Sequence, residues 1–310
     1  NYIYCWMSKC LSGENRDEGF YMWTGTGGNG KSKLVDLSQN CLGDYSCNLP
    51  VSLLTQKRKA SNSAAPEMVR TKGVRLVVMQ EPDVSETLNI GQMKELTGND
   101  KIQARGLFKE PIEFNPQFKM LLMCNDLPLI PGNDDGTWRR LEVVPFQSRF
   151  VEGKEVDESK HRYQIDKELK KKLPFWKIPF LMKLLQEWKE YDTNGINIPE
   201  AVRAQTKSYR NDNDVIGQWI DQCCEIAEYV TGSNGVDKYA PSEFDDLYVD
   251  FKEWCEEQEM KKPDKKTTRE ALLKWQGKSS YGIDISKSKA DKCVHGTYTQ
   301  PKFNLKVRDD

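Results

Sequence analysis

Short apolar runs recur through the first 150 residues of the chain. Four of them have the length and composition of buried strands: 20–24 (FYMWT), 74–80 (VRLVVMQ), 118–125 (FKMLLMCN) and 141–146 (LEVVPF). Helical patterns alternate with the first of these runs, which is typical of a parallel sheet covered by helices. The pattern therefore predicts an α/β domain over residues 1–150.

The pattern changes after residue 150. The stretch 150–160 is polar and charged, which indicates a connector, and DKELKKKL and FLMKLLQEWKEY then have helical spacing. We expect a helical connector or subdomain over 151–212. From 213 onward the pattern predicts helices at about 215–229, 241–258 and 266–275, followed by the strand-like pieces YGIDI and TYTQPKFNLKV. That order favours a winged-helix-like domain over 213–310.

Composition excludes several classes of protein. The 310 residues allow two domains of ordinary size, and a net charge of -1 gives no global basic field. Mean hydropathy is -0.73 and no apolar run reaches 18 residues, so we expect a soluble chain without a membrane partner. Nine cysteines without a C-x-x-C pair and two histidines indicate reduced thiols in a cytosol-like compartment rather than a zinc site. The start at Asn1, without Met or a signal peptide, suggests a piece of a longer polypeptide.

A glycine-rich turn follows the first predicted strand. It fits the pattern G-x-x-x-x-G-K-[ST] with Gly25, Thr26, Gly27, Gly28, Asn29, Gly30, Lys31 and Ser32. In such a loop the backbone N–H groups point at phosphate oxygens, the lysine reaches the β- and γ-phosphates, and the hydroxyl of the last residue holds Mg²⁺. The helix that follows adds the partial positive charge of its N-terminus. The loop therefore predicts a site for ATP with Mg²⁺.

A carboxylate ends the next apolar run. Glu81 would lie at the carboxyl end of the sheet, beside the phosphates, where it can polarise a water as general base. Gln80 stands where many such ATPases have an aspartate for the metal. We therefore expect Ser32 and phosphate to hold Mg²⁺, with Glu81 or Asp83 acting through water. A strand-end acid without a function is the alternative.

An amide ends the run 118–125. Asn125 could hydrogen-bond both the γ-phosphate and the lytic water, and so sense whether the phosphate is present. A polar cap of the strand is the alternative.

The glycine loop, the strand ending at Glu81 and the strand ending at Asn125 follow one another along the chain as in the superfamily 3 helicases, which are AAA+ proteins of viruses and phages, and the chain resembles that family. The resemblance is strongest to the helicase part of the primase-helicases of large DNA viruses, such as poxviruses and their relatives, and of some phages. It rests on Lys31-Ser32, the strand ending at Glu81, Lys94, Leu96-Thr97-Gly98, Asp100, Ala104-Arg105, the strand closing on Asn125, and Trp138-Arg139-Arg140 before 141–146. It implies an AAA+ ATPase core in a hexameric ring that translocates on single-stranded DNA and unwinds forked duplex for genome replication.

The stretch ARGLFKEPIEF predicts two short strands around a tight turn at 109–111. The resemblance implies that this hairpin points into a central channel, where Lys109, with Lys101 and Arg105, would pair with phosphates of one DNA strand. Glu110 beside the tip departs from the family's more basic or aromatic character. A surface hairpin without a function is the alternative.

Two arginines precede the fourth predicted strand. Adjacent guanidinium groups at a strand edge are unfavourable to bury unless anions meet them. We expect one of them, with Arg140 favoured over Arg139, to contact the γ-phosphate of a neighbouring subunit as an arginine finger. The other would hold the interface or a local carboxylate.

Other functions remain open at this stage. The basic clusters MKKPDKKTTRE and ISKSKADK suit DNA or partner binding, but charge runs are often only solvated faces. A nucleotide kinase, a DNA-packaging or origin-binding ATPase that does not unwind, and an assembly module with a vestigial loop are the rivals of a helicase motor. A primase, if one accompanies the motor, would lie upstream of Asn1. A viral motor would work at replication sites in the host cytoplasm or nucleus.

Overall fold

The computed structural model describes residues 1–56, 64–82, 86–226, 242–260, 262–278, 302–303 and 305–307. The chain divides into two compact units, Asn1–Arg210 and Asn211–Asp310. No helix in these ranges is long and apolar enough to cross a membrane.

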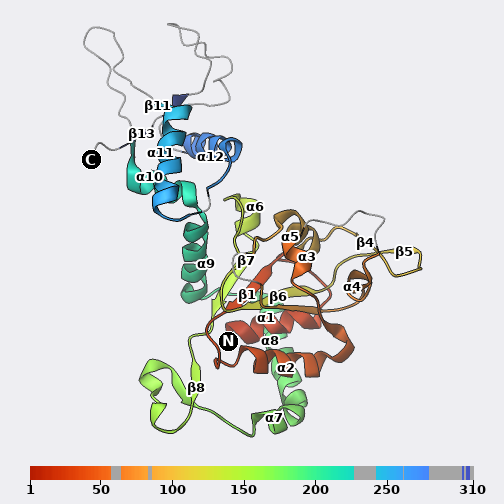
Figure 1. Cartoon of the computed structure of the whole chain (residues 1–310). Coiled ribbons are helices and arrows are strands. Elements are labelled where there is room, and N and C mark those ends of the chain that lie inside the picture. The colour runs from red at the N-terminus through yellow and green to blue at the C-terminus, as the bar shows by residue number, and fades with distance from the viewer. Residues whose placement is uncertain are drawn as a thin grey trace, which may run out of the picture. The chain divides into compact units, whose positions relative to one another are not determined.

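A five-stranded parallel sheet forms the centre of the first unit (Figure 1). Its strand order is β2-β3-β6-β1-β7, and all neighbouring pairs are parallel. The strands are β1 (Phe20–Thr24), β2 (Ser46–Asn48), β3 (Leu76–Gln80), β6 (Lys119–Cys124) and β7 (Leu141–Pro145). The predicted α/β core with a helix-covered parallel sheet is confirmed, because the four apolar runs form its four longest strands.

Successive residues of these strands supply the cores on the two faces of the sheet. Tyr21 and Trp23 of β1 face a cluster with α1 (Tyr2–Ser8), α2 (Lys31–Leu42) and α8 (Lys177–Asn194). Phe20 and Met22 face the opposite cluster, which includes residues of α3 (Ser52–Thr55), α4 (Pro66–Val69), α5 (Ile90–Thr97) and α6 (Asp135–Trp138). Such strands, covered on both faces, read as continuous apolar runs.

The segment 151–210 belongs to the first compact unit. Phe180 and Leu184 of α8 and Val202 of α9 (Glu200–Asn213) are buried in the cluster that covers one face of the sheet. Before them lie β8 (Arg149–Val151), which pairs in parallel with β9 (Arg162–Gln164), and α7 (Leu169–Lys172). The polar stretch expected to be a connector therefore includes a strand that belongs to a separate two-stranded sheet with β9.

The predicted hairpin is present, but its turn lies earlier than expected. β4 (Ile102–Arg105) pairs antiparallel with β5 (Pro111–Phe114), and Lys109 N–H donates to the Gly106 carbonyl across the turn at 3.3 Å. Leu107 and Phe108 therefore form the tip, and Phe108 has a positive φ of 54°. Pro111, which we placed in the turn, begins β5.

The second unit contains the three predicted helices. They are α10 (Val215–Cys223), α11 (Phe244–Glu257) and α12 (Lys265–Lys278), which pack around Trp219, Phe251 and Leu272. Helix α10 ends earlier than its pattern indicated, because β10 (Cys224–Ile226) pairs with β13 (Leu305–Val307). Strand β11 (Ser242–Glu243) pairs with β12 (Lys302–Phe303). The run YGIDI lies outside the described residues, and the winged helix stays a prediction.

Candidate nucleotide-binding site

The glycine loop connects β1 to α2, and it requires glycine at positions with a positive φ or with no room for a side chain. Gly25, Gly28 and Gly30 have φ of 141°, 77° and 87°, values that favour glycine. A Cβ on Gly25 would lie 2.6 Å from the carbonyl oxygen of Phe146 and 2.7 Å from Nδ2 of Asn29. The loop therefore has the backbone of a phosphate cradle at the start of a 12-residue helix.

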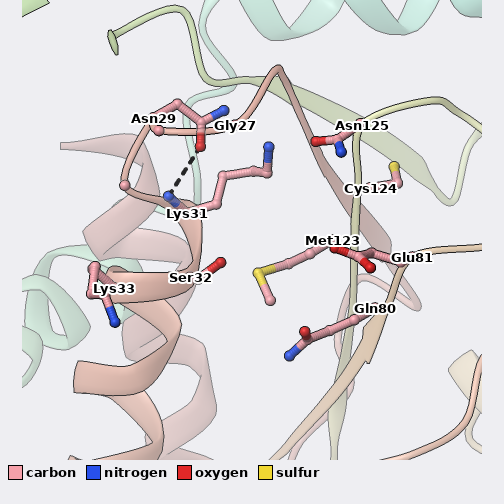
Figure 2. Close-up of a pocket in the computed structure, with 12 residues that line it drawn as sticks. Gly27, Asn29, Lys31, Ser32, Lys33, Gln80, Glu81, Met123, Cys124 and Asn125 are labelled. Atoms are coloured by element: carbon pink, nitrogen blue, oxygen red, sulfur yellow. Dashed lines mark hydrogen bonds between the residues drawn. The ribbon is translucent and has the colours of Figure 1, made fainter. Parts of the chain in front are cut away.

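A cavity of about 300 Å³ lies between this loop and the carboxyl ends of β3 and β6 (Figure 2). The parallel register places Thr24 beside Cys124 and Gln80 beside Met123, so the residues that follow these strands meet at one edge of the sheet. The lining residues are Gly27 to Lys33, Gln80, Glu81, Met123, Cys124 and Asn125. The structure thus brings together most of the predicted loop with Glu81 and Asn125. Gly25 and Thr26, the first two residues of the predicted loop, are not among the residues that line this cavity.

Lys31 is the central charge of the cavity. The residue is only 7% exposed, and burial lowers the pKa of its ammonium. Its Nζ donates to the Gly25 carbonyl, and it forms no ion pair with any residue that the structure describes. The neighbouring thiol does not supply a charge, because burial raises the pKa of Cys124 to about 12. A buried cation with no acidic partner favours a bound anion.

An unpaired donor in the loop agrees with that assignment. Lys31 N–H donates to Asn29 Oδ1 at 3.4 Å (Figure 2), while Asn29 Nδ2 is buried without a partner in the described part of the chain. Buried donors are seldom left unsatisfied. A triphosphate fits this cradle, because its oxygens accept hydrogen bonds from such groups.

Ser32 and Glu81 line the cavity from α2 and from the end of β3, respectively (Figure 2). Glu81 has a φ of 50°, which non-glycine residues seldom adopt, and its N–H donates to the Met123 carbonyl at 2.9 Å. A hydroxyl and a carboxylate that line one cavity suit Mg²⁺, which prefers oxygen ligands and retains several waters. Asp83 lies outside the described residues.

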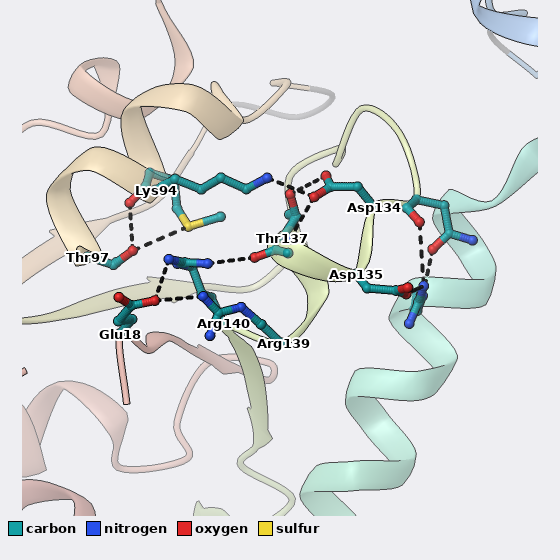
Figure 3. Close-up of polar contacts among 12 residues, drawn as sticks. Glu18, Lys94, Thr97, Asp134, Asp135, Thr137, Arg139 and Arg140 are labelled. Atoms are coloured by element: carbon teal, nitrogen blue, oxygen red, sulfur yellow. Dashed lines mark hydrogen bonds and ion pairs between the residues drawn. The ribbon is translucent and has the colours of Figure 1, made fainter. Parts of the chain in front are cut away.

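Arg139 and Arg140 do not join this cavity. They precede β7, whose Leu141 lies beside Phe20 at the start of β1, so they lie at the amino end of the sheet. Both pair with Glu18 (Figure 3). Their exposures differ, since the side chain of Arg139 is 60% exposed and that of Arg140 only 12%.

Lys94 braces α6, the short helix that immediately precedes the two arginines. Its Nζ lies 2.7 Å from Asp134 Oδ1, and Asp134 caps α6 by accepting a hydrogen bond from Thr137 N–H (Figure 3). Burial alone would raise the pKa of Asp134, but the hydrogen bonds from Lys94 and Thr137 outweigh it and lower this pKa. Lys94, one of the residues on which the family resemblance rests, therefore positions α6 and does not line the cavity.

Two of the three predicted DNA-binding cations of the hairpin, Lys101 and Lys109, are exposed, and Arg105 is partly exposed. Lys101, Arg105 and Lys109 lie on or beside β4 and its turn, and the Arg105 carbonyl accepts a hydrogen bond from Ala65 N–H at 2.8 Å, which holds the hairpin beside α4. Phe108 at the tip is fully exposed and Leu107 is 61% exposed. The three cations thus accompany an apolar tip.

Similarity to known proteins extends over most of the chain. A family model described as "Family of unknown function (DUF5906)" matches residues 23–140. A "Putative helicase" of Acanthamoeba polyphaga mimivirus is 41% identical over 261 residues, which are 82% of this chain and 26% of that protein. A "Putative helicase" of Frog virus 3 is 32% identical over 250 residues, which are 78% of this chain and 25% of that protein. The chain is a relative of proteins named as helicases of large DNA viruses.

This viral family also includes a protein named for priming. A "Putative primase" of African swine fever virus is 28% identical over 211 residues, which are 65% of this chain and 22% of that protein. The resemblance to viral primase-helicases is thereby confirmed. The chain spans about a quarter of the length of these relatives.

Among solved structures, the C-terminal region of NrS-1 is 13% identical, covering 67% of this chain and 46% of that chain, with a TM-score of 0.48. That likeness is too distant to carry an inference.

Sequence reasoning missed two features of this chain, the apolar hairpin tip and the carboxylate between the arginines. The apolar tip of the hairpin was taken as part of a strand, because the turn was expected at 109–111 and the apolar Leu107 and Phe108 precede it. The carboxylate of Glu18 lies in a polar loop far from the arginines in sequence, and no local signal connects it to them.

Proposed function

We propose that the chain is the ATP-driven motor of a viral replicative DNA helicase, with a superfamily 3 AAA+ core. The observation that carries the proposal is the buried Lys31 ammonium, which has no acidic partner among the described residues. It lies in a glycine loop flanked by Glu81 and Asn125, and a triphosphate is the anion that fits this cradle. The names of the viral relatives support unwinding of DNA as the work that hydrolysis drives.

Each lining residue then has a task. Lys31 contacts the β- and γ-phosphates, and the loop N–H groups bind the remaining phosphate oxygens. Ser32 and Glu81 hold Mg²⁺ directly or through water; the ion would neutralise charge that develops on the phosphates. Glu81 orients and deprotonates the attacking water, and the Asn125 amide donates to the γ-phosphate.

An arginine from a neighbouring copy completes the site in this proposal. Five residues of β1 separate the phosphate loop from the arginine end of the sheet, about 16 Å at the usual rise of a strand, so neither arginine suits the loop of its own chain. Exposure favours Arg139 over Arg140 as the group that reaches another subunit. The geometry therefore favours sites shared between subunits, as in a hexameric ring.

The hairpin is the proposed contact with single-stranded DNA. Lys101, Arg105 and Lys109 would pair with phosphates, and Phe108 offers a flat apolar surface on which a base can stack. Forked DNA is the proposed substrate for unwinding. An upstream primase domain or protein and a location at viral replication sites in the host cell belong to the same proposal.

ATP hydrolysis by this chain, measured with and without single-stranded DNA, tests the motor. We expect DNA to stimulate hydrolysis, Lys31→Ala to abolish it, and a forked duplex to be separated only with ATP. A DNA-packaging or origin-binding ATPase would hydrolyse ATP without separating the fork, and a nucleotide kinase would not respond to DNA. Hydrolysis that survives Lys31→Ala would remove the phosphate-cradle assignment.

A further inference from the structure

The polar stretch after β7 forms a second cavity beside the glycine loop. It has a volume of about 730 Å³ and is lined by Thr26, Gly28, Arg149, Phe150, Glu152 and Glu155, among others. We propose that this cavity, here called the base pocket, takes the aromatic base of the nucleoside triphosphate, with Phe150 as the stacking surface. The inference rests on the proposed function, because it requires that the glycine loop hold the triphosphate.

Strand β8 is attached directly to the glycine loop. Phe150 N–H donates to the Gly28 carbonyl at 2.8 Å, and just before it Phe146 N–H donates to the Thr24 carbonyl at 2.8 Å. The Phe150 ring lies against the backbone of Gly30, where a Cβ would meet it at 3.1 Å. These contacts fix the ring relative to the loop, so that a base and a phosphate chain can be bound in one defined geometry.

The two cavities lie on opposite sides of the loop. In the sheet, β1 pairs with β6 along one edge and with β7 along the other. Glu81 and Asn125 follow the strands on the β6 side, whereas the base pocket follows β7. Gly27 and Gly28 line both cavities, so the two cavities adjoin the same part of the loop. A triphosphate with its terminal group near Glu81 would have its nucleoside end toward Phe150.

The surroundings of Phe150 suit a flat ring. Its side chain packs beside Tyr163, with ring centroids 6.2 Å apart, yet the residue remains 39% exposed. A partly exposed aromatic ring gains buried area and stacking energy when a base covers its exposed part. Stacking accepts any base, so this pocket by itself predicts affinity for a nucleoside rather than a choice among bases.

The test separates the nucleoside from the phosphate chain. The dissociation constants of a non-hydrolysable ATP analogue and of inorganic tripolyphosphate are measured by calorimetry with Mg²⁺ on the full 310-residue chain. Phe150→Ala should weaken the analogue about tenfold, as expected for a lost aromatic stack of about 1.4 kcal/mol, and leave tripolyphosphate unchanged. Phe150→Tyr should restore binding. Phe175→Ala, at a phenylalanine that is 82% exposed and not among the residues lining either cavity, is the matched control.

Every other outcome overturns the inference. If Phe150→Ala weakens both ligands equally, the ring only supports the loop, and if it weakens neither, the base lies elsewhere; in both cases the proposed function stands. Lys31→Ala should weaken both ligands in a correctly assigned cradle. A wild-type chain that binds neither ligand would refute the base pocket and the proposed function together.

Discussion

Replacing the two arginines one at a time distinguishes a structural role from a role across the subunit boundary. Arg140 is 12% exposed, donates to the Gly136 carbonyl at 2.8 Å and pairs with Glu18. The side chain of Arg139 is 60% exposed, and among the described residues its guanidinium pairs with Glu18, at 2.8 Å. We therefore expect Arg140→Ala to lower stability and Arg139→Ala to lower hydrolysis.

The magnitudes follow from these contacts. Arg140→Ala removes a mostly buried charged donor and leaves acceptors unsatisfied, at about 2–3 kcal/mol, or a fall in Tm of about 4–12 °C for a unit of this size. Arg139→Ala breaks an exposed ion pair worth at most about 1 kcal/mol, so its Tm should fall by less than about 4 °C. If Arg139 is the finger, its loss should slow hydrolysis about 10³-fold or more.

Thermal unfolding followed by circular dichroism gives the first comparison, and steady-state hydrolysis gives the second. Arg139→Lys is the matched control, because it keeps the charge but loses the planar fork; it should unfold like the wild type and hydrolyse slowly. Mixing inactive Arg139→Ala with inactive Lys31→Ala should restore part of the activity, since some interfaces then have both groups. Wild-type hydrolysis by Arg139→Ala, or no recovery on mixing, would refute the shared site.

Three further predictions concern the loop, the hairpin and the brace of α6. Gly25→Ala should cost about 1–3 kcal/mol of stability and at least tenfold in ATP affinity, whereas Gly27→Ala, which meets no atom within 4 Å, should unfold like the wild type. Binding of single-stranded DNA is measured by fluorescence anisotropy, in which Phe108→Ala should weaken binding about 5- to 100-fold. Lys109→Ala should chiefly reduce the slope of the logarithm of the binding constant against the logarithm of salt concentration, by about one unit. Unchanged binding in both variants would exclude the hairpin as the DNA contact. The pKa of Asp134 is lowered in the folded state, so above about pH 4 the wild type should have a larger free energy of unfolding than Asp134→Asn. This difference should vanish as pH falls through the folded pKa, and a difference that persists in acid would contradict the brace.

The central sheet could be predicted because its strands carry a strong local signal. The run FYMWT coincides with β1, and the other three runs contain β3, β6 and β7 within two residues. Strand β2 was missed because three residues, one buried between two more exposed, have no distinct pattern. Strand β8 was missed because its three residues lie at the start of a polar and charged stretch and have no distinct pattern. It is defined by pairing with β9 and by the hydrogen bond to Gly28, which are both contacts between residues distant in sequence.

The candidate site, too, could be predicted from the sequence only where the signal is local or follows from the order of the strands. The loop from Gly25 to Ser32 is a contiguous motif, and Glu81 and Asn125 could be added because parallel strands end at one edge of a sheet. Phe150 could not, since its only sequence signal is that it follows the strand next to β1. The partner of the arginines could not be predicted either, because Glu18 is more than 120 residues away in sequence.

Glu18 has a consequence for how a ring of such chains could cycle. One carboxylate neutralises two guanidinium groups, so if Arg139 turns toward an anion on an adjacent copy, Glu18 keeps its bond to Arg140. Separating Arg139 from Glu18 then costs about as much as breaking an exposed ion pair, about 0–1 kcal/mol, rather than the several kcal/mol of leaving a buried charge unpaired. A contact that must form and break at every turnover gains from such an exchange of partners at nearly constant energy.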